Sequence, residues 1–168
     1  MLKKKIVLGI ILVLMLLVGN LNSQSKIGVG IVLGSVNGFS GKIWLNNRTA
    51  IDGAVSWHLW EHNVFYIHSD FLWHDSQLIK FRKGKMPFYY GIGGRLVLFE
   101  NRHLSHDWRG EHYEESAILG LRLPVGIEYL SKNRRWEIFI ELALLMDLAP
   151  GIDTGLDAGI GGRYYFGR

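Results

Sequence analysis

The sequence predicts an all-β fold, an eight-stranded antiparallel up-and-down transmembrane β-barrel preceded by a signal-peptide helix. Three observations lead to this prediction. The N-terminus is a short apolar leader, and eight later segments show period-two alternation of apolar side chains. The third observation is the composition, since 21 Gly and only 3 Pro suit closely packed strands better than helices.

The leader has the three parts of a secretory signal peptide. Residues 3–5 are all lysine, residues 6–18 are almost wholly apolar, and small residues precede a cleavage site after Ser25. The apolar run of about 13 residues is short for a spanning helix, which needs about 20. We therefore expect a cleaved signal peptide (residues 1–25) and a barrel domain (residues 26–168). An uncleaved anchor is the alternative.

The charge of the exported part is nearly balanced. Of the 19 Lys and Arg, three lie in the leader, which leaves 16 against 15 Asp and Glu. The basic character of the chain therefore comes mostly from the leader, and we expect no nucleic-acid partner. The sequence holds no Cys, so neither a lipid-bearing cysteine nor a disulfide is expected.

Four alternating segments occupy the first half of the exported part. They are separated by turn-forming pairs such as Asn37-Gly38 and Asn46-Asn47. The predicted strands span residues 26–34, 39–46, 50–60 and 64–74. Their apolar faces are, in order, Ile27, Val29, Ile31 and Leu33; Phe39, Ile43 and Leu45; Ile51, Val55, Trp57 and Leu59; and Phe65, Ile67, Phe71 and Trp73.

The second half repeats the pattern with longer segments. The predicted strands span residues 87–99, 117–130, 136–148 and 155–166, and the longest connection is residues 100–116. Their apolar faces are, in order, Phe88, Tyr90, Ile92, Leu96 and Leu98; Leu119, Leu121, Leu123, Val125, Ile127 and Tyr129; Trp136, Ile138, Ile140, Leu142, Leu144 and Met146; and Leu156, Ala158, Ile160, Tyr164 and Phe166.

The residues opposite the apolar faces favour a membrane barrel over a soluble one. A solvated face would be rich in Lys, Glu and Thr, whereas here it is mostly Gly, Tyr and Ser with a few charges. The apolar faces carry no charge, as lipid requires, since Lys or Arg at the bilayer midplane costs about 2–4 kcal/mol. Strands of about 9–11 residues cross a bilayer, and eight is the smallest usual number. We expect a monomer in contact with the lipid of a bacterial outer membrane.

Aromatic residues of the apolar faces gather at one level. If the first strand begins in the periplasm, they lie near the periplasmic ends of their strands, where an amphipathic ring is best solvated. The predicted aromatic girdle consists of Trp73, Phe88, Tyr90, Tyr129, Trp136, Tyr164 and Phe166.

The C-terminal segment carries a family resemblance. Residues 155–166 end Arg-Tyr-Tyr-Phe and resemble the C-terminal strand that marks outer-membrane proteins for barrel insertion. Residues 26–166 as a whole resemble the small OmpA/OmpX-like barrels. The segments PFYYGIGGR, EIFIELALLMDL and GIGGRYYF are similar to a spirochaete-type outer-membrane family. The resemblance implies the barrel architecture and contact with the insertion machinery during assembly, and it implies no particular activity.

Charged residues opposite the apolar faces point into the predicted lumen. Charges in a low-dielectric interior must be paired and hydrogen-bonded, and one guanidinium can bind two carboxylates. We expect an ion-pair network that plugs the narrow lumen of an eight-stranded barrel. Its predicted members are Lys42, Asp52, Asp70, Arg95, Arg122, Glu128, Glu141, Asp157 and Arg163.

The connection at residues 100–116 is the predicted site of partner contact. Its histidines and carboxylates match no standard metal-site spacing, so we expect neither a metal nor another cofactor. On the topology above it is extracellular, which suits contact with an extracellular protein. The predicted contact residues are His103, His106, Trp108, His112 and Tyr113.

No catalytic residues are predicted, and we expect a structural or surface-interaction role. A lipid-modifying barrel enzyme would need a paired Ser and His on the outer surface. His68 and Ser69 are adjacent and therefore point to opposite faces, while Ser56 and His58 share the inner face. The alternatives left open are a narrow pore for ions or small solutes and a soluble ligand-binding barrel.

Overall fold

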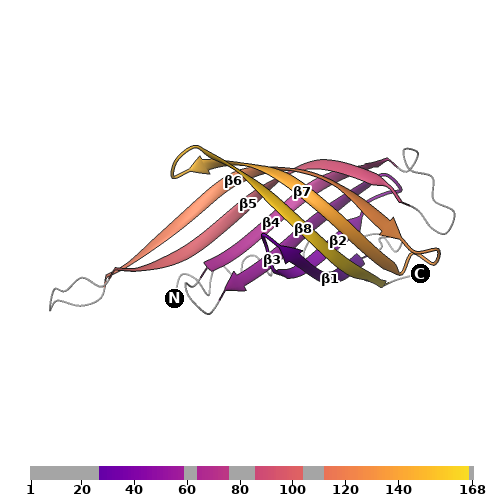
Figure 1. The fold of residues 1–168 in the computed structure, drawn as a ribbon, viewed down its shortest axis with the longest axis horizontal. Coiled ribbons are helices and arrows are strands. Elements are labelled where there is room, and N and C mark those ends of the chain that lie inside the picture. The colour runs from indigo at the N-terminus through magenta and orange to yellow at the C-terminus, as the bar shows by residue number, and fades with distance from the viewer. Residues whose placement is uncertain (1–26, 59–63, 76–85, 104–111, 167–168) are drawn as a thin grey trace.

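A computed structural model of the chain shows eight strands in one closed antiparallel barrel (Figure 1). The structure describes residues 27–58, 64–75, 86–103 and 112–166, so the predicted signal peptide lies outside the described residues. No helix in these ranges is long and apolar enough to cross a membrane. The strands are β1 (Ile27–Gly34), β2 (Gly38–Trp44), β3 (Thr49–His58), β4 (Val64–Asp75), β5 (Phe88–His103), β6 (His112–Leu130), β7 (Trp136–Ala149) and β8 (Asp153–Phe166).

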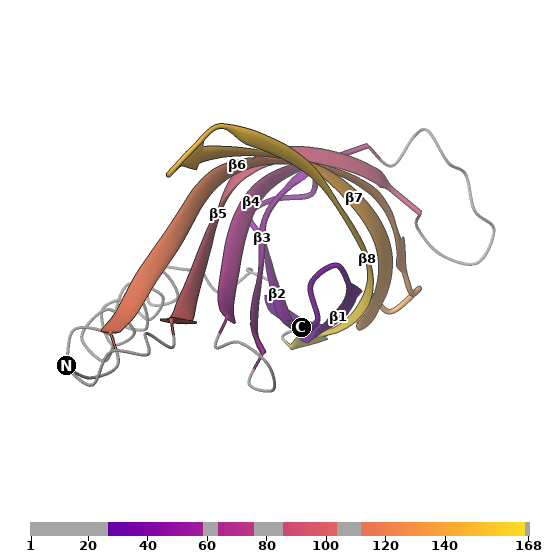
Figure 2. The same ribbon diagram turned by 60° about the vertical axis from the view of Figure 1, so that its left-hand side comes forward.

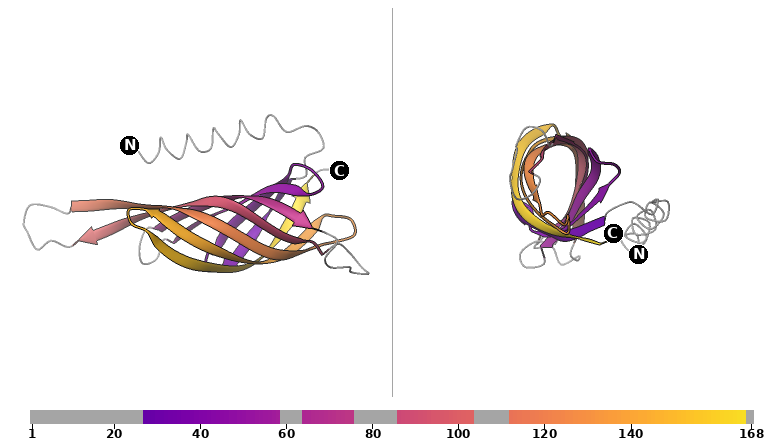
Figure 3. Two further views of the ribbon diagram at one scale, coloured as in Figure 1. Left: turned by 90° about the horizontal axis from the view of Figure 1, so that it is seen from above. Right: turned by 90° about the vertical axis from the view of Figure 1, so that its right-hand side faces the viewer.

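Each strand pairs with its neighbour in the sequence, and β8 returns to pair with β1 (Figure 3). The closing register runs from Ile27↔Phe166 to Gly34↔Gly159. Closure gives the strands of the barrel wall hydrogen-bonding partners on both sides, so that wall needs no water to satisfy its backbone. We call the end that holds Ile27 and Phe166 the terminal rim, and the opposite end the hairpin rim.

The eight predicted strands are confirmed, and the main correction concerns the connection predicted at residues 100–116. β5 and β6 continue to pair as far as His103↔His112, so both ends of that segment are strand. This hairpin extends well past the rest of the barrel (Figures 1 and 2). The prediction missed the extension because polar residues form it, as in the pair Glu100↔Glu115, and apolar alternation cannot reveal such a strand.

The connection between β2 and β3 is also slightly longer than predicted. β2 ends at Trp44, two residues before the predicted end at residue 46, and β3 begins at Thr49. The Asn46 carboxamide explains this, because its Oδ1 accepts hydrogen bonds from the backbone N–H of Arg48 (2.8 Å) and Thr49 (2.9 Å). The last two residues of the predicted third strand, 59 and 60, lie outside the described residues.

The apolar alternation faces outward, as the sequence predicts for a barrel in lipid. On β7, Ile140 is 61% exposed whereas its neighbours Phe139 and Glu141 are 3% and 8% exposed. The same contrast between alternate residues recurs over most of the described positions in the other strands. The polar residues therefore lie in the lumen, and the large apolar residues cover the outside.

Inward glycines make room for the largest inward side chains. Gly28 lies opposite Tyr165 and Gly126 opposite Tyr89 in the cross-strand register. A Cβ atom at Gly28 would come within 2.6 Å of the Tyr165 ring, and one at Gly126 within 2.4 Å of the Tyr89 ring. Much of the high Gly content therefore reflects how side chains fill a narrow lumen.

Candidate functional site

Charged side chains fill the lumen, and the strand register places several of them opposite one another on neighbouring strands. Lys42, Asp52 and Asp70 lie directly opposite one another on β2, β3 and β4. Gly93 and Arg122 continue this row on β5 and β6. All four side chains of the row are buried. The row forms a charged belt across more than half of the barrel wall, which we call the lumenal belt.

Lys42 is the centre of the group nearest the terminal rim. Its ammonium pairs with Glu128 and lies 3.6 Å from Oε2 of Glu137. His74 Nε2 is 3.5 Å from Oε2 of Glu128, and the ammonium lies 4.6 Å from the centroid of the Trp44 ring. A fully buried ammonium thus has two carboxylates and an aromatic face as partners.

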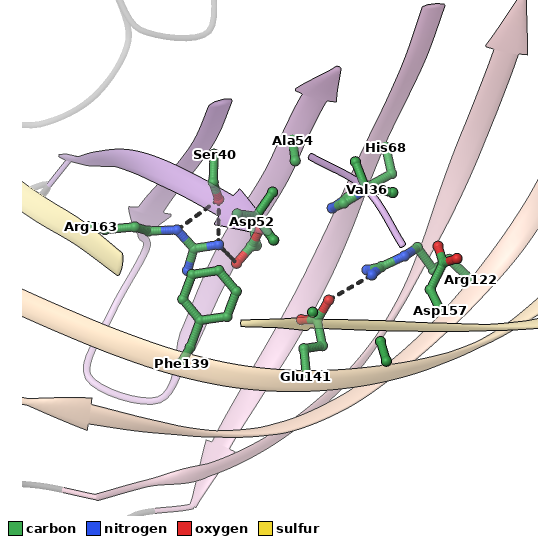
Figure 4. A pocket seen from close by; sticks show the side chains of 13 residues that line it. Val36, Ser40, Asp52, Ala54, His68, Arg122, Phe139, Glu141, Asp157 and Arg163 are labelled. Atoms are coloured by element: carbon green, nitrogen blue, oxygen red, sulfur yellow. Dashed lines mark hydrogen bonds and ion pairs between the residues drawn. The ribbon is translucent and has the colours of Figure 1, made fainter. Parts of the chain in front are cut away.

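Arg163 from β8 is the centre of a second group (Figure 4). Its guanidinium lies 2.6 Å from Oε1 of Glu137 and 2.6 Å from Oδ2 of Asp52. Nε and Nη2 donate to the Ser40 hydroxyl at 2.9 and 2.6 Å. The Phe139 ring stacks against the same guanidinium, 4.0 Å from its central carbon. Both charged edges and one face of this arginine are therefore occupied.

Arg122 from β6 is the centre of a third group. Its Nη1 donates to Asp70, and its Nη2 donates to Oε1 of Glu141 at 2.6 Å (Figure 4). The Tyr89 hydroxyl donates to the other Glu141 oxygen at 2.9 Å. Arg122 reaches Asp70 past Gly93, where a Cβ atom would lie only 2.0 Å from Oδ1 of Asp70. The missing side chain at Gly93 therefore permits this ion pair.

Two further contacts lie closer to the hairpin rim. Arg95 binds Asp147 through both carboxylate oxygens, with Nη2 at 2.8 Å from each of them. These side chains are 14% and 13% exposed, so this pair is better solvated than the three groups above. Asp157 accepts a hydrogen bond from the Tyr66 hydroxyl at 3.2 Å.

The structure brings the predicted network residues into one lumen. Eight of the nine take part in ion pairs, and Asp157 instead contacts a tyrosine. Glu137 and Asp147, which alternation also assigns to the inward face, complete the pairs. Glu137 joins the Lys42 and Arg163 groups, and Asp147 is the partner of Arg95.

A small cavity of about 20 Å³ separates the Arg163 and Arg122 groups (Figure 4). A cavity of this size has room for about one water molecule. The side chains of Asp52, His68, Glu141 and Asp157 line it together with the two arginines. Among the described residues, no three His, Asp or Glu side chains are grouped so that they could hold a metal ion.

The predicted girdle residues all lie at the terminal rim. Trp73 faces Tyr90 across the β4–β5 pair, and their rings stack with centroids 5.9 Å apart. Trp136 meets Tyr164 edge to face at 4.9 Å. Phe88, Tyr129 and Phe166 stand at the same ends of their strands. The seven rings thus form a band on one edge of the barrel, and its interfacial role stays a prediction.

The predicted partner-contact residues divide into two sets. His106 and Trp108 lie outside the described residues. His103 ends β5 and pairs with His112 at the start of β6, and Tyr113 pairs with Arg102. The described members of the predicted contact surface, His103, His112 and Tyr113, therefore lie on paired strands of a long β-hairpin.

The two polar neighbours His68 and Ser69 do not form a nucleophile and base. His68 is buried in the lumen at 7% exposure, whereas Ser69 is exposed on the outer surface. Adjacent strand residues point to opposite faces, so the hydroxyl and the imidazole are separated by the barrel wall.

The fold and the charged lumen place the chain in one structural class, the small eight-stranded barrels with a charged interior.

No family model and no curated protein matches the sequence. The N-terminal β-barrel domain of Pseudomonas aeruginosa OprF is similar in structure, with a TM-score of 0.56, 12% identity, and coverage of 84% of this chain and 96% of that one. This likeness supports the fold alone.

Two further solved barrels resemble the chain more distantly. Neisserial surface protein A has a TM-score of 0.47 at 11% identity, covering 84% of this chain and 94% of that one. Ail, the attachment invasion locus protein of Yersinia pestis, has a TM-score of 0.43 at 13% identity, covering 87% and 100%. The spirochaete-type resemblance stays a prediction.

Proposed function

We propose that the chain is an integral outer-membrane barrel with a plugged lumen and a structural or surface-contact role. The outer surface carries this proposal. Between the rims, the outward positions of the described strands hold no Asp, Glu, Lys or Arg. Large apolar side chains stand exposed there, such as Ile140 at 61% and Leu144 at 60%. Such a belt is unfavourable in water and is solvated by acyl chains in lipid.

The filled lumen supports a structural role over a pore. Arg122 and Arg163 each bind two carboxylates across the lumen. Lys42 is fully buried between Glu128 and Glu137, and it shares Glu137 with Arg163. The cavity between the arginines has room for about one water molecule. An ion would have to break several buried pairs to pass. Discrete single-channel conductance in planar bilayers would favour the pore instead.

The β5–β6 hairpin is the surface that we propose for partner contact. The β4–β5 pairing ends at Val64↔Phe99 and the β6–β7 pairing at Leu119↔Ala149, but β5 and β6 stay paired beyond both points. The hairpin therefore projects from the hairpin rim, at the end of the barrel opposite Ile27 and Phe166. We infer that the chain is a monomer, assembled by the insertion machinery with both termini in the periplasm. In that orientation the hairpin lies outside the cell and can contact an extracellular protein.

Fractionation of cells that express the full chain tests the location. We expect the protein in the outer-membrane fraction, resistant to extraction by alkaline carbonate, with the hairpin cleaved by protease added to intact cells. Recovery from the soluble periplasmic fraction would contradict the membrane location. Protection of the hairpin in intact cells, with cleavage only after lysis, would contradict the proposed orientation.

A further inference from the structure

The buried part of the lumen holds more acidic groups than basic ones. Among the buried residues that the structure describes, five are acidic and three are Lys or Arg. The acidic set is Asp52, Asp70, Glu128, Glu137 and Glu141, and the basic set is Lys42, Arg122 and Arg163. His74 lies beside Glu128 and could balance one carboxylate when protonated. At least one further positive charge is then needed, because an uncompensated buried carboxylate is very unfavourable.

Asp52 and Asp70 are the pair at which this excess is concentrated. They lie directly opposite each other on β3 and β4, and both point into the lumen. The Cβ atoms of such a pair are about 4.5–5.5 Å apart, and like charges at this spacing repel. Oδ1 of Asp70 is buried without a hydrogen-bond partner among the described groups. Two carboxylates that share a site in this way tend to retain one proton.

The charges around this pair come from every neighbouring strand. Lys42 stands next to Asp52 on β2, and Arg163 from β8 is 2.6 Å from Oδ2 of Asp52. Arg122 from β6 pairs with Asp70, and His68 Nε2 from β4 itself is 3.9 Å away. The other nearby groups are Tyr89 on β5 and the carboxylates Glu137 and Glu141 on β7. Each aspartate therefore pairs with one guanidinium. That guanidinium also pairs with a glutamate on β7.

A proton fits this place better than a metal ion. No metal-holding group of three His, Asp or Glu side chains exists among the described residues. The adjoining cavity has a volume of only about 20 Å³ and is lined by both arginines, which repel a cation. A proton needs no cavity, and it converts an acceptor-only carboxylate into a hydrogen-bond donor.

We propose that Asp52 and Asp70 hold one proton between them in the folded barrel at neutral pH. The proton is taken from solvent when the barrel folds, since both carboxyls of the unfolded chain are ionised at that pH. The folded barrel then binds one proton more than the unfolded chain. The equilibrium constant for unfolding consequently rises about tenfold per pH unit above about pH 5, for as long as the proton remains bound.

Infrared spectroscopy of the folded barrel in an ester-free detergent tests this directly. A neutral carboxylic acid has a carbonyl band that ionised carboxylates lack and that shifts in D₂O. We expect this band at pH 7 in the wild type and its loss in both Asp52→Asn and Asp70→Asn, because one remaining carboxylate is neutralised by its own arginine. Asp153→Asn, at an exposed aspartate on the start of β8, should retain it.

Each other outcome contradicts the proposal. Absence of the band in the folded wild type would show that the pair is fully ionised, and this reading does not depend on any variant folding. A band that survives in both asparagine variants would place the proton elsewhere. If the wild type lacked the band and its unfolding midpoint rose with added Na⁺ or K⁺, a bound cation would replace the proton.

Discussion

At the scale of single residues, we expect stability to depend on a few buried arginines. Arg122 binds Asp70 and Glu141 in a site with almost no access to solvent. Removing one partner of such a group leaves the remaining charges buried and uncompensated, which costs about 3–5 kcal/mol. We expect Arg122→Ala to lower the free energy of unfolding by this amount, measured by urea titration of the folded barrel in detergent.

Arg95→Ala is the matched control for that measurement. Arg95 also points inward, but it binds a single carboxylate and its side chain is 14% exposed. Solvent screens such a pair and can hydrate Asp147 after the change, so the loss should be smaller. Equal losses for the two variants, or unchanged unfolding of Arg122→Ala, would contradict the central place given to Arg122.

Two adjacent glycines of β5 allow a sharper comparison. A Cβ atom at Gly93 would lie 2.0 Å from Oδ1 of Asp70 and 2.3 Å from the Ser69 carbonyl oxygen, whereas one at Gly94 meets nothing closer than 3.7 Å. We expect Gly93→Ala to destabilise the barrel by about 1–3 kcal/mol through overpacking. Gly94→Ala should change the unfolding midpoint little. A Gly93→Ala variant as stable as Gly94→Ala would contradict the close packing of the lumen.

The sequence predicted whether a side chain points into the lumen or outward, but it did not predict which residues form ion pairs. Alternation with the apolar face assigns Lys42 and Arg95 to the lumen without any structure. Their partners Glu128 and Asp147 lie on strands far away in sequence. Which carboxylate a given arginine meets depends on the register of every intervening pair and on the tilt of the strands around the barrel. Neither quantity can be read from one segment.

At the scale of strands, apolar alternation predicted the barrel wall well and the β5–β6 hairpin poorly. The wall segments must bury one face and expose the other to lipid, which fixes a strong period of two. The extension from Glu100 to His103 and its partner strand lie beyond the wall, where no such requirement holds. Strand pairing there leaves no apolar signature.

The hairpin extension should be dispensable for folding. Its cross-strand pairs, from Glu100↔Glu115 to His103↔His112, involve only β5 and β6. We expect replacement of residues 101–114 by a short Asn-Gly turn to leave the unfolding midpoint of the barrel within experimental error. A large loss of stability would show that the extension packs on the wall. Cell-surface binding to an extracellular protein that survives this deletion would contradict the proposed contact surface.

At the scale of the whole molecule, the proposed membrane location depends on the uncharged outer belt. Leu142 is an outward residue in the middle of β7 and is 48% exposed. Leu142→Lys should reduce the yield of folded barrel in lipid vesicles and destabilise it by about 2–4 kcal/mol. Asn47→Lys, in the exposed turn between β2 and β3, adds the same charge outside the belt and should have little effect. Equal folding of both variants in vesicles would contradict the assignment of β7 to the lipid.

The mobility of the purified protein on a gel, before and after boiling in SDS, tests the central claim most directly. A closed barrel with a plugged, ion-paired lumen resists SDS at room temperature, so its unheated band should run faster than the boiled one. Identical mobility of the two samples, together with solubility in the absence of detergent, would contradict a membrane-spanning barrel.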